Sequence, residues 1–307
     1  MKKISILILA FLMIGLSGCV INLEDNIDEI RINTDNFKLN FDLDNRVEIG
    51  DLKTYTKIIE LEKQEELDVR LDVNAAKINI SSTSDKLFEG KVETDIQNLV
   101  PIMELNRNKL VIDDDFSYKS LDFSYKSLRN FTNDWMLKIT DKVPLNFNIK
   151  TNATKNNFDF TGLQIEDLRM NINAADTDII FNEVNKADFK IFRLDLNAGS
   201  VEVRGLDYSV VEEIDVKVNA GNVKLEFGDS IIKDTKIYLN GNASNATVEL
   251  PENVGVSVER ESNLVNIDIN NHSFNKSGNS YTSKNYDTAK HTIDIVVTGA
   301  MFNVEIK

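Results

Sequence analysis

Residues 194–203 read Leu-Asp-Leu-Asn-Ala-Gly-Ser-Val-Glu-Val, and this stretch decides the fold. Two leucines alternate with polar residues before the small-residue step, and two valines flank Glu202 after it. Such alternation is typical of a strand with one buried face. The stretch therefore predicts two half-buried strands that are joined by a tight corner at 197–199. We expect Asn and Gly to adopt the left-handed backbone conformation there, and Ala to point into the bend.

This corner recurs at a nearly constant spacing. Close copies lie at 173–175, 197–199 and 219–221, and looser copies lie at 152–154 and 240–243. The first residues of successive copies are 21, 24, 22 and 21 positions apart. A fixed period of about 20 to 50 residues indicates a solenoid, in which each repeat is one coil. An antiparallel β-sandwich is the alternative, but its turns are usually Asn-Gly or Asp-Gly at irregular spacing.

The alternating pattern extends in both directions from these corners. It predicts about seven coils between 145 and 307, with further corners near 261–263 and 298–300. A strand pair of the same kind lies near 67–80, with its corner at 74–76. We therefore predict an all-β chain: a β-solenoid of stacked coils, each one strand pair of about 21–24 residues, preceded by a less regular β segment.

The N-terminus predicts export and lipidation. Lys2 and Lys3 precede an almost wholly apolar stretch, 4–16, which is too short for a membrane-spanning helix of about 20 residues. The sequence Leu-Ser-Gly-Cys at 16–19 then resembles a bacterial lipobox, and Cys19 is the only cysteine in the chain. We expect cleavage after residue 18 and acyl chains such as palmitate on Cys19, which would hold the protein at the extracytoplasmic face of the cell membrane.

The predicted organisation has four parts. Residues 1–18 are a lipoprotein signal peptide that is removed, and residues 19–52 are the lipid anchor and a polar tether. Residues 53–142 form the less regular N-terminal β segment, and residues 143–307 form the regular stack.

The charge excludes some partners. The chain has 50 acidic and 35 basic residues, a formal charge of −15, and the loss of Lys2 and Lys3 would take it to −17. Nucleic-acid binding needs basic patches, so no nucleic-acid partner is expected. The acidic residues are spread over outward strand positions such as Asp195 and Glu226, which is typical of a solvated face.

No arrangement of residues predicts catalysis, a cofactor or a metal. His272 and His291 have no cysteine or second histidine at ligand spacing, and we interpret them as surface residues. Asp113, Asp114 and Asp115 lack the spacing of a calcium loop. Phosphate loops and nucleophile elbows are also missing from the sequence.

The repeat is interrupted in three places, 20–52, 113–128 and 270–290, and we expect any localised function there. The second contains a tandem duplication of Asp-Phe-Ser-Tyr-Lys-Ser-Leu at 115–121 and 122–128. This duplication is either a tolerated surface loop or a display of aromatic side chains to a partner. The third is rich in Asn, Ser and Lys and could bind a ligand or be a passive excursion.

Two stretches resemble a known family. Trp135 is followed by Pro144-Leu145-Asn146-Phe147 and then by the corners, and residues 71–80 read Leu-Asp-Val-Asn-Ala-Ala-Lys-Ile-Asn-Ile. This combination resembles the toast-rack family of β-solenoid domains in bacterial envelope proteins. It is similar to the C-terminal domain of the cell-wall-active-antibiotics-response (Lia-type) regulators and to adhesin-like repeat domains. The resemblance covers roughly 60–269 and implies a non-catalytic role.

These features together predict a non-enzymatic, lipid-anchored envelope protein. We expect it to bind or scaffold an envelope protein or cell-wall partner, in the response to cell-envelope stress. A surface adhesin that binds an external ligand is the alternative, and an envelope carbohydrate-active enzyme is a third interpretation.

Overall fold

The computed structural model of the chain describes residues 20–22, 29–34, 37–42, 49–114, 131–229, 231–270 and 273–307. Contacts divide the chain into two compact units. The smaller unit contains an antiparallel sheet in the order β1 (Val20–Asn22), β2 (Glu29–Thr34) and β3 (Phe37–Asp42). The larger unit, 54–92, 101–114 and 134–307, contains the coils.

The other elements are almost all strands. They are β4 (Ile49–Ile59), β5 (Leu67–Asn74), β6 (Lys77–Thr83), β7 (Phe88–Ile96), β8 (Ile102–Asn106), β9 (Lys109–Asp113), β10 (Asn133–Thr140), β11 (Pro144–Asn152), β12 (Thr154–Asp159), β13 (Gln164–Ile180), β14 (Ile191–Arg204), α2 (Leu206–Ser209), β15 (Glu213–Glu226), β16 (Thr235–Glu249), β17 (Gly255–Arg260), β18 (Val265–Ile269), β19 (Phe274–Ser277), β20 (Ser280–Ser283) and β21 (Thr292–Ile306).

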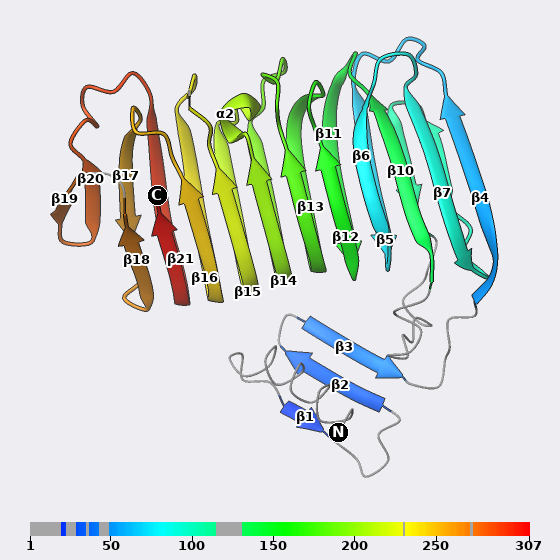
Figure 1. The fold of residues 1–307 in the computed structure, drawn as a ribbon, viewed down its shortest axis with the longest axis horizontal. Helices are drawn as coiled ribbons and strands as arrows, with labels where there is room; N and C mark the ends of the chain where they lie inside the picture. The colour runs from blue at the N-terminus through cyan, green and yellow to red at the C-terminus, as the bar shows by residue number, and fades with distance from the viewer. Residues whose placement is uncertain are drawn as a thin grey trace. The chain divides into compact units, whose positions relative to one another are not determined.

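Among the described residues, eight coils with a complete corner stack through parallel pairing, which confirms the predicted all-β solenoid. Five coils are single long strands that bend at the corner, namely β13, β14, β15, β16 and β21. Three coils are strand pairs, namely β5–β6, β11–β12 and β17–β18. In each coil, the segment before the corner belongs to one layer of the stack, and the segment after the corner belongs to a second layer. We call these the first-strand layer and the second-strand layer (Figure 1).

Neighbouring coils are in register, so equivalent residues lie side by side. Ala174 lies opposite Ala198, and Ala198 lies opposite Ala220. Each coil is therefore about 4.8 Å from the next, the spacing of paired strands. Side chains that are equivalent in the repeat form rows along the stack.

The order of coils in space differs from their order in the sequence at the C-terminal end. The last strand, β21, pairs in parallel with β16 on one side. On its other side it pairs with β17 and β18, which precede it in the chain (Figure 1). The coil that ends the chain is thus inserted into the stack, and the coil at 255–269 lies outside it.

The other end shows a similar excursion. The strand β11 pairs in parallel with β5 over eight residues, and β12 pairs with β6. On the other side of the coil formed by β5 and β6, β9 pairs with β5 and β10 pairs with β6, also in parallel. The predicted boundary at residue 143 stays a prediction, but strands from both sides of it belong to one stack.

The core lies between the two layers and contains the predicted inward residues. The four apolar positions of 194–203 are all at most 1% exposed. A line of phenylalanines runs along the stack, with ring centroids 5.3 Å apart for Phe147 and Phe160 and 5.7 Å apart for Phe160 and Phe181. Two predicted inward residues, Ile267 and Ile269, are only half-buried because, in the part of the chain that the structure describes, no coil covers them on the side away from β21.

The corners correct two expectations. No asparagine in the described residues has a positive φ; the left-handed positions are instead occupied by Ala75 (φ 47°), Ala153 (φ 55°), Ala243 (φ 49°), Gly199 (φ 115°), Gly299 (φ 136°) and Met301 (φ 52°). The corner of β16 also starts later than expected. Asn240 lies opposite Lys217, and Asn245 lies opposite Asn222, so Asn242 is the equivalent of Asn219. The repeat distance there is 23 residues rather than 21.

Candidate binding surface

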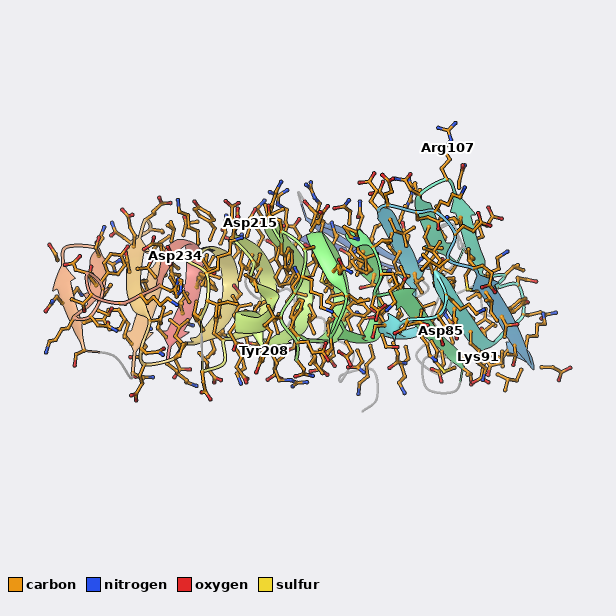
Figure 2. The ribbon with its side chains drawn as sticks, turned by 90° about the horizontal axis from the view of Figure 1, so that it is seen from above. Asp85, Lys91, Arg107, Tyr208, Asp215 and Asp234 are labelled. Atoms are coloured by element: carbon orange, nitrogen blue, oxygen red, sulfur yellow. The ribbon has the colours of Figure 1, made fainter. Side chains whose placement is uncertain are left out.

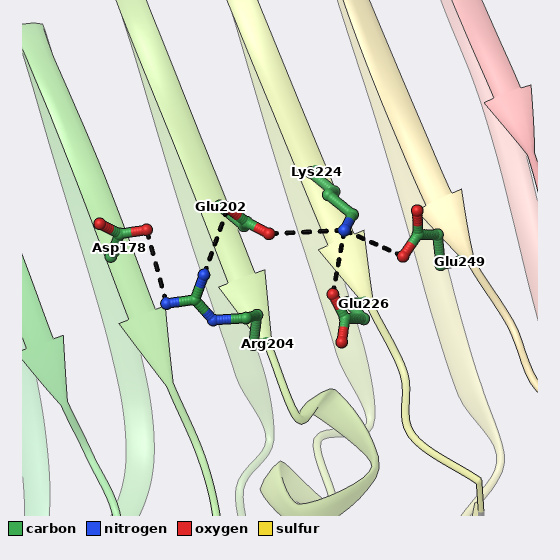
Figure 3. A network of polar contacts seen from close by, with 6 residues as sticks. All are labelled: Asp178, Glu202, Arg204, Lys224, Glu226 and Glu249. Carbon is green, nitrogen blue, oxygen red and sulfur yellow. Dashed lines mark hydrogen bonds and ion pairs between the residues drawn. The ribbon is translucent and has the colours of Figure 1, made fainter.

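The outward positions of the second-strand layer form rows of charged side chains. Glu202 lies between Asp178 and Lys224 in one row. In the adjacent row Glu226 lies between Arg204 and Glu249. Six residues from four coils are therefore neighbours on one flat surface, and we call them the charged row: Asp178, Glu202, Arg204, Lys224, Glu226 and Glu249 (Figure 3).

Lys224 is the centre of the charged row. Its Nζ lies 3.0 Å from Oε2 of Glu249, 3.0 Å from Oε2 of Glu226 and 3.4 Å from Oε1 of Glu202 (Figure 3). The hydrogen bonds to Glu249 and then Glu226 raise the pKa of the Lys224 ammonium group. Lys224 therefore stays charged throughout the physiological pH range.

Arg204 links a second pair of carboxylates. Its Nη1 lies 3.3 Å from Oε2 of Glu202, and its Nη2 lies 3.6 Å from Oδ1 of Asp178 (Figure 3). The six side chains are between 32% and 46% exposed, so a partner can reach them. With four carboxylates and two cations the charged row has a formal charge of −2. Exposed ion pairs contribute only about 0–1 kcal/mol to stability, so the fold does not depend on this arrangement.

The asparagines of the corners bond to one another. Asn197 donates from Nδ2 to Oδ1 of Asn173 and accepts at Oδ1 from Asn219 Nδ2, at 2.5 and 2.7 Å. Asn242 continues the ladder to Asn219 at 3.4 Å. A parallel ladder joins Asn222, Asn245 and Asn303. Because each amide has a donor and an acceptor, stacked asparagines satisfy each other. These amides therefore hold neighbouring coils together at the corners.

A shallow hollow of about 750 Å³ lies where the first strands of four coils begin. It is lined by Lys190, Ile191, Glu212, Glu213, Lys233, Asp234, Thr235, Lys236, Thr292 and Asp294. Lys233 Nζ lies 2.8 Å from Oε1 of Glu212. Burial lowers the pKa of Lys233, but hydrogen bonds to Glu212 and Asp188 outweigh burial and raise it. Asp215 and Tyr208 lie toward opposite long sides of the stack (Figure 2).

The residues singled out in the sequence are widely separated. Nδ1 of His291 lies 3.2 Å from Oδ1 of Asp234 at the rim of the hollow. The buried Asp114 accepts hydrogen bonds from the backbone N–H and from Nδ2 of Asn74, at 2.6 and 3.1 Å. It therefore completes a corner of the coil at 67–83. Cys19, His272 and Asp115 lie outside the described residues.

Two negative findings apply to the described part of the chain. It contains no group of three or more His, Cys, Asp or Glu side chains that could hold a metal ion. None of its helices combines the length and the apolar character that a membrane span requires.

The structure describes the interruptions of the repeat to different extents. The duplicated segment 115–128 lies outside the described residues, between β9 and β10. Within 270–290, β19 and β20 form an antiparallel hairpin that pairs with β17. The sequence signal for this hairpin is Gly278-Asn279 between two short alternating stretches, a typical two-residue turn. This hairpin was not predicted from the sequence. Arg204 and Lys224 were not identified as candidate site residues either, because only the register between coils shows which carboxylates surround them.

Several known proteins are similar to this chain. One solved structure is a candidate cell adhesion protein from Clostridium sporogenes ATCC 15579, with 21% identity, 84% of this chain and 99% of that chain covered, and a TM-score of 0.44. Another is a candidate adhesin from Bacteroides fragilis NCTC 9343, with 11% identity, 84% and 97% covered, and a TM-score of 0.36. A third is a candidate lipid-binding protein from Parabacteroides distasonis ATCC 8503, with 14% identity, 83% and 97% covered, and a TM-score of 0.33.

Among curated protein sequences the chain has no significant match. The family model described as the N-terminal domain of toast_rack, DUF2154, matches residues 48–204, just over half of the chain. The matched residues include the coil at 67–83 and the first three corners of the regular stack. The chain therefore belongs to the toast-rack family.

Proposed function

We propose that this protein is a non-enzymatic binding module of the cell envelope, anchored through acyl chains on Cys19 at the extracytoplasmic face of the membrane. The charged row is the observation that most supports the binding role in this proposal. Its side chains are fixed on parallel strands about 4.8 Å apart, and its excess of carboxylates favours a partner surface that carries Lys or Arg. A rigid array of this kind recognises an extended partner without a conformational change.

The partner in this proposal is an envelope protein or a cell-wall component, and the role is scaffolding in the envelope stress response. Membership of the toast-rack family supports this role, because the family resembles regulators of the cell-wall-active-antibiotics response. The net negative charge of the four carboxylates would attract the partner, whereas Lys224 and Arg204 would hold these carboxylates in place.

A charge-reversal experiment tests the binding surface. The double variant Glu226→Lys and Glu249→Lys changes the charged row, and the double variant Asp195→Lys and Glu213→Lys makes the same charge change on the first-strand layer. We expect the first variant no longer to cross-link to its envelope partner. Cells that carry this variant should respond to wall-active drugs like a deletion strain. The second should behave like the wild type. Equal behaviour of the two variants would contradict the proposal.

The anchor is tested separately. Cys19→Ser should abolish labelling by radioactive palmitate and move the protein from the membrane to the soluble fraction. Unchanged labelling would refute lipidation at Cys19. If deletion of the protein leaves the drug response unchanged but reduces attachment of cells to surfaces, the stress-response role is wrong and the adhesin prediction is favoured.

A further inference from the structure

The two layers end differently at the coil formed by β17 and β18. In the first-strand layer, β17 is followed by β20 and β19, which continue the sheet by two antiparallel strands. In the second-strand layer, β18 pairs with β21, and within the described residues no strand pairs with its other side. The hairpin therefore extends beyond β18, at the left end of the stack (Figure 1).

The free side of β18 exposes backbone hydrogen-bonding groups. The N–H of Asn270 donates to the carbonyl of Ile306 on β21, at 2.9 Å. Successive residues of a strand direct their backbone N–H and C=O groups to opposite edges, so the backbone groups of Asn266 and Asp268 also point toward β21. The N–H and C=O groups of Val265, Ile267 and Ile269 consequently face away from the stack. Such a row of unpaired groups is a template for an added strand.

The side chains at this edge are apolar on the core side and acidic on the outer side. Ile267 and Ile269 are half-buried, although the equivalent residues of β21, Val304 and Ile306, are at most 1% exposed. On the outer side Asp268 is exposed and forms no ion pair within the described part of the chain. Among the described residues, no strand pairs with this edge and no cation pairs with Asp268; the basic side chain on the hairpin, Lys276, lies over the ring of Tyr281 instead.

The hairpin supplies the opposite wall of this space. Tyr281 of β20 pairs with Val258, which is fully buried, and directly opposed side chains of antiparallel strands share one face. Tyr281 therefore lies on the core side of the first-strand layer. Phe274 of β19 pairs with the buried Ser283 and lies on the same face. Both aromatic residues are only half-buried.

We propose that the free edge of β18 binds an extended peptide segment of a partner protein, which adds to the second-strand layer as one further strand. Alternate apolar side chains of the peptide would cover Ile267 and Ile269 beneath the hairpin. A Lys or Arg on its outer side would pair with Asp268. Main-chain hydrogen bonds provide affinity in such strand addition, and the alternate side chains provide specificity. This site is separate from the charged row and does not depend on it.

A second copy of the chain does not fit this edge. Two β18 strands paired about a two-fold axis would bring the two β17 strands to a similar separation of about 4.8 Å. The four strands of the two hairpins would then need about 24 Å in the same layer, at about 4.8 Å per strand. The hairpins would collide, whereas a single peptide strand needs only half of the space that one hairpin covers.

Amide hydrogen exchange measured by NMR tests the proposal on the full chain with Cys19→Ser. The probe is a capped heptapeptide of alternating Val and Lys. Without it, the amides of Val265, Ile267 and Ile269 should exchange fast, and those of Asn266 and Asp268 slowly. With the probe at about ten times its Kd, exchange of the first three should slow about ten-fold. The same peptide with N-methyl groups on the edge that faces β18 should give no protection. Equal protection by both peptides, or by neither, overturns the proposal.

Two variants locate the site. Asp268→Lys should weaken binding of the Lys probe by on the order of five-fold, and a Glu probe should then bind better. Glu259→Lys, an exposed position on β17, changes the net charge equally and should have no effect. Ile267→Pro removes the N–H that faces the free edge and replaces isoleucine by the smaller apolar proline ring, but it removes no N–H that faces β21, so the circular dichroism spectrum should stay unchanged while binding is lost. Equal effects of the two charge reversals, or protection of these amides by dimerisation without peptide, would refute the peptide site.

Discussion

The corner of β14 allows a quantitative test of how closely the coils pack. Gly199 has a φ of 115°, and a Cβ at this position would lie 2.0 Å from the carbonyl oxygen of Ala175 in the neighbouring coil. Gly199→Ala therefore has two unfavourable effects. The backbone conformation is strained for any L side chain, by about 1–3 kcal/mol. The overlap with a backbone oxygen adds about 1–3 kcal/mol, as overpacking does elsewhere.

The combined loss of unfolding free energy should be about 2–6 kcal/mol. Two other glycines separate the contributions. Gly278 has a φ of 60°, but a Cβ added there would have no atom within 4 Å, so Gly278→Ala should lose only about 1–2 kcal/mol through strain. At Gly221 no positive φ occurs, but a Cβ would lie 2.4 Å from the oxygen of Gly199. Gly221→Ala should lose about 1–3 kcal/mol through overlap alone.

Urea-induced unfolding measures these differences. The single tryptophan, Trp135, is fully buried and reports unfolding by fluorescence, while circular dichroism reports loss of strands along the whole stack. Both signals are needed because coils of a repeat protein can unfold separately. A Gly199→Ala protein whose unfolding free energy is within about 0.5 kcal/mol of the wild type would refute the close packing of the corners.

Three further results are expected. Leu194→Ala removes a side chain that is 0% exposed and should lower the unfolding free energy by about 2–5 kcal/mol, whereas Leu264→Ala, at 67% exposure, should change it by less than about 0.5 kcal/mol. Asn197→Ala interrupts the asparagine ladder on both sides and should lower the unfolding free energy by about 1 kcal/mol, and the exposed Asn171→Ala should not. A hydrogen bond to Asp294 at 2.7 Å, and then burial, raise the pKa of Tyr286 to about 12, above its ordinary value of about 10. The stability that this contact contributes is therefore present below pH 10 and is lost between about pH 10 and 12. Tyrosinate absorbance of Tyr286→Phe should differ from the wild type only near the top of this range.

For each of these three expectations, one result of the comparison would contradict it. If Leu194→Ala and Leu264→Ala melt alike, the alternation does not mark the core. If Asn197→Ala and Asn171→Ala are equally stable, the ladder adds nothing to the stack. If the difference titration between wild type and Tyr286→Phe is centred near pH 10, the contact with Asp294 does not form.

Local patterns predicted the coil itself. Alternation of Leu and Val around 197–199 identified the buried face, and the recurring corner identified stacking, because both depend on residues that are close in the sequence. The charged row could not be predicted in this way. Glu202 and Glu226 are recognisably outward in the sequence, but their contacts with Lys224 depend on the register between different coils.

The corners show why residue preference alone misled the prediction. Asparagine tolerates the left-handed conformation, yet at Asn173, Asn197 and Asn219 its amide pairs with the next coil instead. The strained positions pass to small neighbours such as Ala153 and Gly199. An amide that finds a partner in each adjacent coil outweighs its own backbone preference, and this partner exists only in the stack.

The position of β21 could not be deduced from the sequence either. Every coil has the same inward apolar pattern, so any coil can pair with any other. The coil at 255–269 leaves one strand position free beside β16, and the segment from 270 to 291 lets the chain return to that position as β21. Nothing local to Thr292–Ile306 indicates which neighbour it has.

Disulfide trapping tests the stack and its register most directly. In a Cys19→Ser background, Thr247→Cys and Glu305→Cys lie directly opposite each other on β16 and β21, at a separation that permits a disulfide. Thr247→Cys and Asp268→Cys would be opposite if the coils followed the order of the sequence, but β21 places them two strands, about 10 Å, apart. We predict rapid oxidation of the first pair alone. Oxidation of the second pair instead of the first would contradict the inserted coil and the rows of side chains that depend on it.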